Sequence, residues 1–238
     1  MTEWFEEWFG EEYLHLYPHR DERDAVRLVA LMVQVLPWRP GWKVLDLACG
    51  AGRHLLALAD SGAQPIGLDL SPSLLARAHE TTRAPLVRAD LRRLPVRRGT
   101  MDLTVNLFTS FGYFETDEEH AEAMSGMLAT VKPGGWFALD FLNPAAVSDH
   151  LVPSEELALA NTVVRVTRSL SDDGRFVIKH IDTPEGRRFT ERVRLFSPPE
   201  LEAMFAANQV PVIHRFGDYQ GGLLTAESPR TILIGRHR

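Results

Sequence analysis

KVLDLACGAGRHLL, residues 43–56, organises the architecture we expect for the whole chain. A short apolar run passes into the small-residue turn 48–52, and leucines at helical spacing follow at once. Strand, glycine turn and helix in immediate succession are typical of the start of a βαβ unit. Because Gly50 and Gly52 have no Cβ, a ligand can lie against the backbone, where the helix N-terminus offers unpaired N–H groups. The stretch therefore predicts a nucleotide-like ligand at this turn.

An acid within this stretch indicates which ligand to expect. A pyrophosphate dinucleotide favours a third glycine at the position where this chain has Leu55. The chain instead has Asp46 at the strand end, followed by A-C-G-A-G. The eleven residues VLDLACGAGRH resemble motif I of the class I (Rossmann-like) S-adenosylmethionine-dependent methyltransferases. The resemblance implies an α/β fold with a Rossmann-like seven-stranded sheet, helices on both faces, and S-adenosyl-L-methionine as cofactor.

A second acid ends the next predicted strand, the apolar segment 65–69. Asp69 follows Asp46 at close to the ~20-residue offset at which a carboxylate meets ribose hydroxyls in Rossmann-type folds. The alternative role for this acid is a helix N-cap, but Ser71, ahead of Pro72, already serves that role. We therefore expect Asp69 to bind the ribose.

The third predicted strand, 86–89, is followed by Asp90 and Leu91. By the resemblance, Asp90 accepts a hydrogen bond from the adenine amino group, and the backbone N–H of Leu91 meets the ring. The basic run 88–98, RADLRRLPVRR, could contact RNA, but no aromatic residues interleave for base stacking. It is more typical of a solvated loop.

The fourth predicted strand, 101–107, leads into FTSFGYF, residues 108–114. Open α/β sheets bind ligands outside the carboxyl ends of their strands, so this aromatic loop should face the transferred methyl group. Relatives that methylate exocyclic amines of bases or glutamine amides often carry Asn/Asp-Pro-Pro-Tyr/Phe here. This chain has N-L-F-T at 106–109, which disfavours nucleic-acid N-methylation. SFGYF itself resembles a bacterial and archaeal subgroup of small methyltransferases.

The second half of the chain interrupts the alternation of strands and helices. A K-P-G-G turn before the apolar segment 136–141 is another hallmark of the family that the chain resembles. From residue 153 the period changes to two, which predicts an inserted antiparallel meander of three strands. Such an insert either covers the acceptor or forms an annex that stabilises or dimerises the protein. We expect three parts: a helical lid (1–40), the Rossmann-like domain (41–152 and 197–238) and the inserted β subdomain (153–196).

The N-terminal 40 residues hold two helical patterns, and the first is rich in aromatic residues. This segment is either core packing or a lid over the cofactor mouth. His15 and His19 are four residues apart, but Pro18 breaks the helical geometry that would aim both at a metal. We therefore predict no metal site.

The composition of the chain disfavours several classes of protein. The chain has 238 residues, 45% of them hydrophobic, and a net charge of −6, which disfavours a large nucleic-acid footprint. No apolar run approaches the roughly 18 residues of a membrane span, and no secretory signal is visible. One cysteine fits a reducing compartment, so we expect a cytoplasmic protein without membrane partners. Monomer and homodimer both stay open.

The resemblance, carried over residue by residue, assigns the cofactor contacts, whereas the acceptor contacts are our own hypothesis. The predicted function is methyl transfer from S-adenosylmethionine to a small-molecule N or O acceptor. The alternatives are an RNA or protein methyltransferase, a nucleotide-binding protein without transfer activity, and an NAD-dependent enzyme. His120, Glu191 and Tyr113 are candidate bases, each with a structural alternative. The expected cofactor contacts are Tyr17, Asp46, Ala48, Cys49, Gly50, Gly52, Arg53, Asp69, Leu70, Asp90, Leu91, Asn106 and Leu107, and the expected acceptor contacts are Phe111, Tyr113, Asn143 and Arg192.

Overall fold

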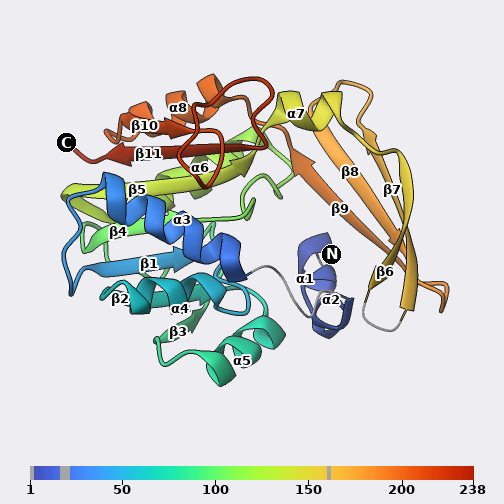
Figure 1. The fold of residues 1–238 in the computed structure, drawn as a ribbon, viewed down its shortest axis with the longest axis horizontal. Coiled ribbons are helices and arrows are strands. Elements are labelled where there is room, and N and C mark those ends of the chain that lie inside the picture. Colours follow the sequence, from blue (N-terminus) through green and yellow to red (C-terminus); the bar gives the residue numbers. More distant parts are fainter. Residues whose placement is uncertain (1–2, 17–21, 160–161) are drawn as a thin grey trace.

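One mixed sheet of seven strands forms the body of the molecule (Figure 1). The computed structural model describes residues 3–16, 22–159 and 162–238. The strand order is β10-β11-β5-β4-β1-β2-β3, and of these seven β11 runs antiparallel to both of its neighbours. The predicted fold class is thereby confirmed. The strands are β1 (Lys43–Leu47), β2 (Gln64–Asp69), β3 (Leu86–Arg88), β4 (Met101–Asn106), β5 (Val131–Leu142), β10 (Val212–Phe216) and β11 (Arg230–Arg236).

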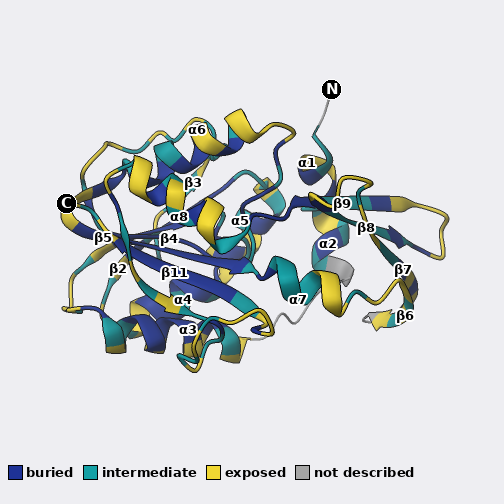
Figure 2. Cartoon of the chain, turned by 90° about the horizontal axis from the view of Figure 1, so that it is seen from above, coloured by how far each residue is buried: buried dark blue, intermediate teal, exposed yellow. Residues whose placement is uncertain are grey.

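Helices cover both faces of this sheet, and Figure 2 shows its strands as a buried layer between them. On one face α3 (Glu22–Val35) and α4 (Arg53–Asp60) pack on apolar side chains of β1, β4 and β11. On the other face lie α6 (Asp117–Leu128) and α8 (Pro198–Ala207), each begun by a capping box. α5 (Pro72–Thr81) packs beside β2 and β3. Burial on both faces explains why the central strands read as continuous apolar runs.

The insert is a separate antiparallel sheet of four strands, not the three that the sequence predicts. The prediction is wrong because it leaves out the first strand, β6 (Ser154–Leu159), whose sequence SEELAL consists mostly of helix-forming residues. Pairing with the next strand along its whole length overrides that propensity. The remaining strands are β7 (Thr162–Leu170), β8 (Phe176–Asp182) and β9 (Arg188–Arg194), and the short helix α7 (Pro144–Asp149) leads into the insert.

Two short helices, α1 (Trp4–Trp8) and α2 (Glu11–Leu16), lie between the two sheets (Figure 1). The ring of Trp8 is almost fully buried and lies 4.8 Å from that of Phe189 on β9, centroid to centroid. Trp4 packs edge-on against Tyr113, 5.0 Å away, in the loop after β4. The N-terminal aromatic residues therefore join the insert to the main sheet. No helix of the described ranges has the length and apolar character that a membrane crossing needs.

Candidate functional site

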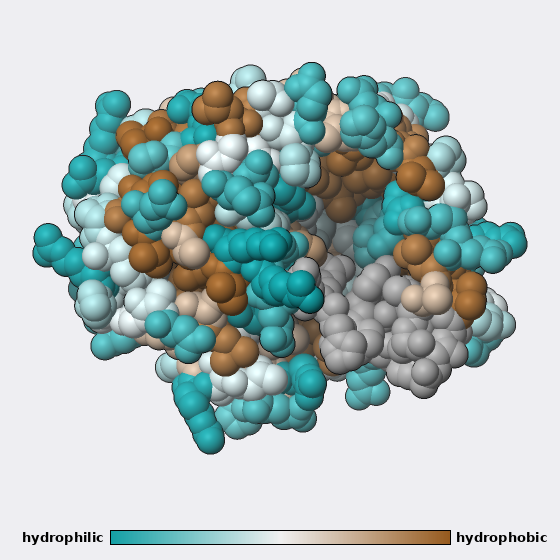
Figure 3. Space-filling model, in the orientation of Figure 1, coloured by the Kyte–Doolittle hydropathy of each residue, from teal (hydrophilic) through white to brown (hydrophobic). Residues whose placement is uncertain are grey.

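A cavity of about 970 Å³ lies outside the carboxyl ends of β1, β2 and β4 and extends to the inner face of the insert. Figure 3 shows the molecule hollowed between its two parts. β1 pairs in parallel with β2 on one side and with β4 on the other, so the order in which successive strands join the sheet reverses at β1. Such a switch point is where open α/β sheets bind their ligands. The cavity has room for a nucleotide-sized cofactor and an acceptor.

The glycine turn after β1 forms one wall of the cavity. Gly50 and Gly52 have φ angles of 56° and 87°, which favour glycine, and Gly52 is the N-cap of α4. A Cβ at Gly50 would meet nothing within 4 Å, whereas one at Gly52 would lie 3.1 Å from the Cβ of Ala78. The turn therefore leaves backbone open toward a ligand while it keeps α4 and α5 close together.

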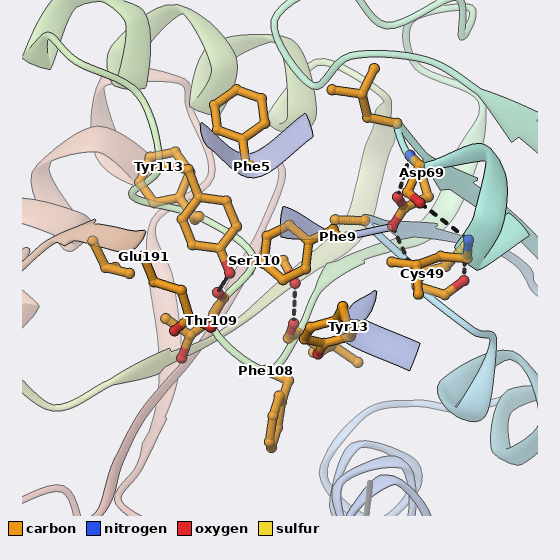
Figure 4. Close-up of a pocket in the computed structure, with 18 of the residues that line it drawn as sticks. Phe5, Phe9, Tyr13, Cys49, Asp69, Phe108, Thr109, Ser110, Tyr113 and Glu191 are labelled. Atoms are coloured by element: carbon orange, nitrogen blue, oxygen red, sulfur yellow. Dashed lines mark hydrogen bonds between the residues drawn. The ribbon is translucent and has the colours of Figure 1, made fainter. Parts of the chain in front are cut away.

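Asp69 is held at the edge of this turn by two backbone N–H groups. Gly50 N donates to Oδ2 at 2.8 Å and Ser71 N donates to Oδ1 at 2.8 Å (Figure 4). Burial raises the pKa of the Asp69 carboxyl, while the N–H groups of Ser71 and Gly50 act in the opposite direction. The side chain is thereby fixed in one orientation on the cavity wall, where its remaining lone pairs can accept hydroxyl groups.

Asp46 and Asn106 lie behind the wall and are almost completely buried. Asn106 Nδ2 donates to the carbonyl of Leu47 at 3.0 Å. Asp46 Oδ2 and Asn106 Oδ1 have no hydrogen-bond partner within the described part of the chain. Burial, and then the neighbouring Asp69 carboxylate, raises the pKa of Asp46 to about 8. Two buried acceptors beside the turn fit a ligand that brings positive charge and N–H donors, as the methionyl ammonium of S-adenosylmethionine does.

Asp90 lies farther along the same wall and is bound by the side chain of Arg92. Both carboxylate oxygens accept from this guanidinium, with Arg92 Nη2 at 2.7 Å from Oδ2. Partial burial acts to raise the pKa of Asp90, but the hydrogen bonds from Arg92 hold it below the ordinary range. Arg92 also pairs with Glu3 and Glu119, so this member of the basic run is engaged in ion pairs within the protein.

The far wall of the cavity combines aromatic rings with two ion pairs. Arg168 on β7 pairs with Glu155 on β6 at 2.6 Å, and Lys179 on β8 pairs with Glu191 on β9 at 3.3 Å. Glu191 also accepts from Trp8 Nε1 at 2.7 Å, which ties α1 to the insert. Figure 4 shows Glu191 and Tyr113 on one side of the pocket and Cys49 and Asp69 on the other. The rings on this wall belong to Trp4, Phe5, Phe9, Tyr13, Tyr113 and Phe114.

The structure brings most of the sequence-predicted site residues to this one cavity. Gly52 supports the turn, and Asp46 and Asn106 lie behind it. Tyr17 lies outside the described residues, as do the side chains of His15 and His19. His120 is enclosed among rings, accepts from Phe114 N at 3.2 Å and does not line the cavity. The predicted residues on the wall are Ala48, Cys49, Gly50, Arg53, Asp69, Leu70, Asp90, Leu91, Leu107, Phe111, Tyr113 and Glu191.

Asn143 and Arg192, two of the residues expected near the acceptor, do not line the cavity. Asn143 caps α7 through Oδ1, and its Nδ2 donates to the carbonyl of Ser228 at 2.7 Å. Arg192 lies over the ring of Phe176, 3.4 Å from its centroid. Both side chains therefore hold local structure together.

Other wall residues were not among those predicted. Arg168 and Lys179 reach the cavity because the insert folds over it, and strand alternation alone does not say which face of a sheet points inward. Arg230 comes from β11, at the far end of the sequence from the glycine turn. Glu191, in contrast, is one of the predicted candidate bases, and Lys179 lies opposite it in the pairing of β8 with β9.

Comparison with known proteins agrees with this geometry. Residues 44–135 match a family model described as a methyltransferase domain. The dTDP-3-amino-3,6-dideoxy-alpha-D-glucopyranose N,N-dimethyltransferase of Streptomyces fradiae is 31% identical over 220 residues, which cover 85% of this chain and 83% of that protein. An uncharacterized methyltransferase of Synechocystis sp. is 40% identical over 115 residues, 48% of this chain and 53% of that protein. The chain thus spans about half the length of this second relative.

The solved structure of the CcbJ methyltransferase from Streptomyces caelestis has the same fold, with a TM-score of 0.80 and 20% identity over 99% of this chain and 98% of that one. Sheet order, glycine turn and cavity together define a Rossmann-like S-adenosylmethionine-binding enzyme. The chain belongs to the class I S-adenosylmethionine-dependent methyltransferases. As a member of this family, the chain uses S-adenosyl-L-methionine as its cofactor and methyl donor.

Proposed function

We propose that the enzyme methylates an amine nitrogen of a small, polar acceptor. The observation that carries this proposal is the charged inner face of the insert, where Glu155, Arg168, Lys179 and Glu191 line the cavity. Four partly buried charges would be costly against an apolar acceptor, whereas a polar acceptor can exchange hydrogen bonds with them. The Streptomyces fradiae relative is named for N,N-dimethylation of an amino sugar, which supports nitrogen as the acceptor atom.

The cofactor contacts follow from the residues on the near wall. Asp69 would accept both ribose hydroxyls, and Asp90 with the backbone of Leu91 would hold the adenine. The turn at Gly50, with Asp46 behind it, would hold the methionyl end. When bound, S-adenosylmethionine supplies an electrophilic methyl group that a lone pair can displace in line.

The chain's own contribution is to orient the acceptor and exclude water. The rings of Phe9 and Tyr113 stack 5.7 Å apart over the centre of the cavity, and α1 closes it from outside. Holding an amine in line with a methyl carbon can supply on the order of 7–11 kcal/mol of the barrier at best. Glu191 can accept a hydrogen bond from the amine and so orient its lone pair. A neutral amine needs no base.

Three further parts of the proposal concern the chain as a whole. Of the predicted lid, 1–40, residues 3–16 act as the lid, since α1 and α2 both line the cavity and touch the insert, whereas α3 belongs to the core of the main sheet. The domain bounds are 41–152 with 197–238, and 153–196 for the insert. The SFGYF segment marks a subgroup of small methyltransferases, and the protein acts in the cytoplasm.

Incubation with methyl-labelled S-adenosylmethionine and a panel of acceptors tests the proposal. The panel contains free amino sugars, nucleotide-linked amino sugars, matched sugars with a hydroxyl in place of the amine, and a short RNA. We expect label on the amines. Label on the hydroxyl compounds or the RNA, with none on any amine, would overturn it.

A further inference from the structure

The loop after β4 has a backbone conformation that its residues do not favour. Phe108 and Thr109 have φ angles of 58° and 60°, in the left-handed region. A β-branched residue with positive φ is uncommon, and two consecutive bulky residues in this region are strained. Both residues line the cavity between the glycine turn and the insert. Something in the surrounding structure must hold them there.

A buried acid at the end of β5 holds the backbone of this loop. Asp140 is completely buried, and its Oδ2 accepts from Phe108 N at 2.9 Å. The Asp140 carbonyl accepts from Thr109 N at 2.9 Å. Two successive N–H groups of the loop therefore point at one residue. A right-handed backbone at Phe108 and Thr109 would break this arrangement.

Arg230, at the start of β11, holds the acid and the loop together. Its Nε donates to Asp140 Oδ1 at 2.7 Å, and its Nη2 donates to Thr109 Oγ1 at 2.9 Å. Tyr219 also donates to Asp140 Oδ2 at 2.9 Å. The planar guanidinium suits this task, because its two nitrogens reach two partners in fixed directions. The antiparallel pairing of β11 with β5 places Arg230 beside the end of β5.

The loop connects this pair to both sides of the cavity. Thr109 accepts, through its carbonyl oxygen, a hydrogen bond from the hydroxyl of Tyr113 on the acceptor side. On the cofactor side, the guanidinium carbon of Arg53, the first residue of α4, lies 4.0 Å from the centroid of the Phe108 ring. A shift of Phe108 and Thr109 would therefore move Tyr113 and disturb the contact with the glycine-turn helix.

We infer that Asp140 and Arg230 are positioning residues for methyl transfer, which hold Phe108 and Thr109 in the left-handed conformation and thereby orient Tyr113 toward the acceptor. Neither needs to touch the reacting atoms. If the ion pair were purely structural, its removal would lower the stability of the protein, and the effects of removing it and of changing Tyr113 on kcat would be independent. The kinetic part of this inference rests on the proposed function, while its structural part does not.

Hydrogen exchange tests the structural part without any acceptor. In Arg230→Lys the charge beside Asp140 stays, but the paired contacts to Asp140 and Thr109 cannot both form. We expect the amides of Phe108 and Thr109 to exchange about tenfold faster or more, with β4 and β5 unchanged. The matched control is Arg194→Gln, which removes another buried guanidinium, bonded to Asp117 and Glu200. It should leave both amides protected, and unchanged exchange in Arg230→Lys would overturn the inference.

A double-mutant cycle tests the kinetic part, with an amine acceptor that the wild-type enzyme methylates. We expect Arg230→Lys to lower kcat about 10- to 100-fold per folded molecule, with the KM for S-adenosylmethionine changed less than about twofold. Tyr113→Phe should then have little further effect in that background. Additive losses, or an equal loss of kcat in Arg194→Gln, would contradict the inference. If wild type methylates no amine, the proposed function fails, and hydrogen exchange still decides whether the pair holds the loop.

Discussion

The cofactor wall and the acceptor wall of the cavity are built in opposite ways. The cofactor wall comes from short stretches at the ends of β1, β2 and β3. Behind it, Asp46 Oδ2 and Asn106 Oδ1 are buried and have no hydrogen-bond partner among the described residues. The acceptor wall comes from α1, the loop after β4 and the insert, and its charges already pair with one another. Two acceptors behind the cofactor wall thus lack a hydrogen-bond partner in the part of the chain that the structure describes. The charged side chains of the acceptor wall are already paired, so they must exchange partners when a ligand binds.

This difference separates the energetic roles of the two walls. A residue of the cofactor wall should affect ligand affinity more than a residue of the acceptor wall does, because the buried acceptors of Asp46 and Asn106 behind it have no partner within residues 3–16, 22–159 and 162–238. A residue of the acceptor wall should affect the docking of α1 and the insert, because its contacts exist before binding. Four substitutions or conditions test this division.

Trp8→Ala should have the largest effect, and on the acceptor wall. Truncation of a buried tryptophan costs about 3–5 kcal/mol, and the hydrogen bond to Glu191 is lost as well. We expect α1 to open locally while the main sheet stays folded, because Trp8 packs on Phe189 of the insert. Hydrogen exchange of α1, set against that of β1 and β4, measures this.

Trp8→Phe is the control for that experiment, since it keeps an aromatic ring, although a smaller one, and removes the Nε1 donor to the Glu191 carboxylate. Its cost should be smaller than that of Trp8→Ala and at least about 1.5 kcal/mol, the scale of a hydrogen bond to a charged group. A loss of protection spread evenly over the whole sheet in Trp8→Ala would show that α1 is core and not a lid.

Asp69→Ala should have the next largest effect, and on ligand affinity. We expect binding of S-adenosylhomocysteine to weaken by about 1–3 kcal/mol, the scale of a hydrogen bond to a charged group. Calorimetry at constant pH measures it, with Asp182→Ala on the insert as a control outside the cavity. Equal affinity in wild type and Asp69→Ala would remove Asp69 from the cofactor site.

The affinity for S-adenosylhomocysteine should depend on pH through the ionisation of Asp46. Its pKa is raised from 3.8 to about 8 by burial and by Asp69, so the free folded protein holds this proton at neutral pH. A ligand ammonium favours the ionised form. Affinity for S-adenosylhomocysteine should therefore rise between pH 6 and 8, by at most about tenfold per pH unit, with release of a proton. Calorimetry in buffers of different ionisation enthalpy counts that proton.

Asp46 also determines whether the stability of the ligand-free protein rises or falls with pH. Between pH 3.8 and about 8 the folded chain binds a proton at Asp46 that the unfolded chain has released. The free energy of unfolding contributed by this group therefore falls as pH rises through that window. Asp46→Asn should abolish both pH dependences, and a pH-independent affinity in wild type would contradict the assignment.

Lys179→Met should have the smallest effect. The pair with Glu191 is about one-sixth exposed on either side, but Glu191 keeps its hydrogen bond from Trp8 when Lys179 is removed, so the loss of stability should be smaller than in Trp8→Ala. Affinity for S-adenosylhomocysteine should stay within about twofold, while the KM for a polar acceptor rises. Thermal unfolding and a KM comparison measure these, and a large loss of cofactor affinity would show that the two walls are not separate.

Much of the main sheet follows from local sequence, because its signals are contiguous. Alternation of apolar segments with helical patterns, and the acids Asp46, Asp69 and Asp90 at strand ends, predict the sheet and one wall of the site. β6 is absent from the prediction because its residues favour a helix and only its pairing with β7 makes it a strand. Asn143 and Arg192 are near strand ends and aromatic residues in sequence, but their side chains turn to local partners.

By itself the sequence determined the position of the glycine turn and of the acids at the strand ends, since these depend on backbone conformation and burial within about fifty residues. Its resemblance to motif I added the class of enzyme and the cofactor. The tertiary structure decided which side chains meet across the cavity. Asp140, Arg230 and Thr109 come from three separate segments, and the register of β11 on β5 joins them. Such contacts depend on strand order and on which face of the insert points inward, and neither is encoded in local periodicity.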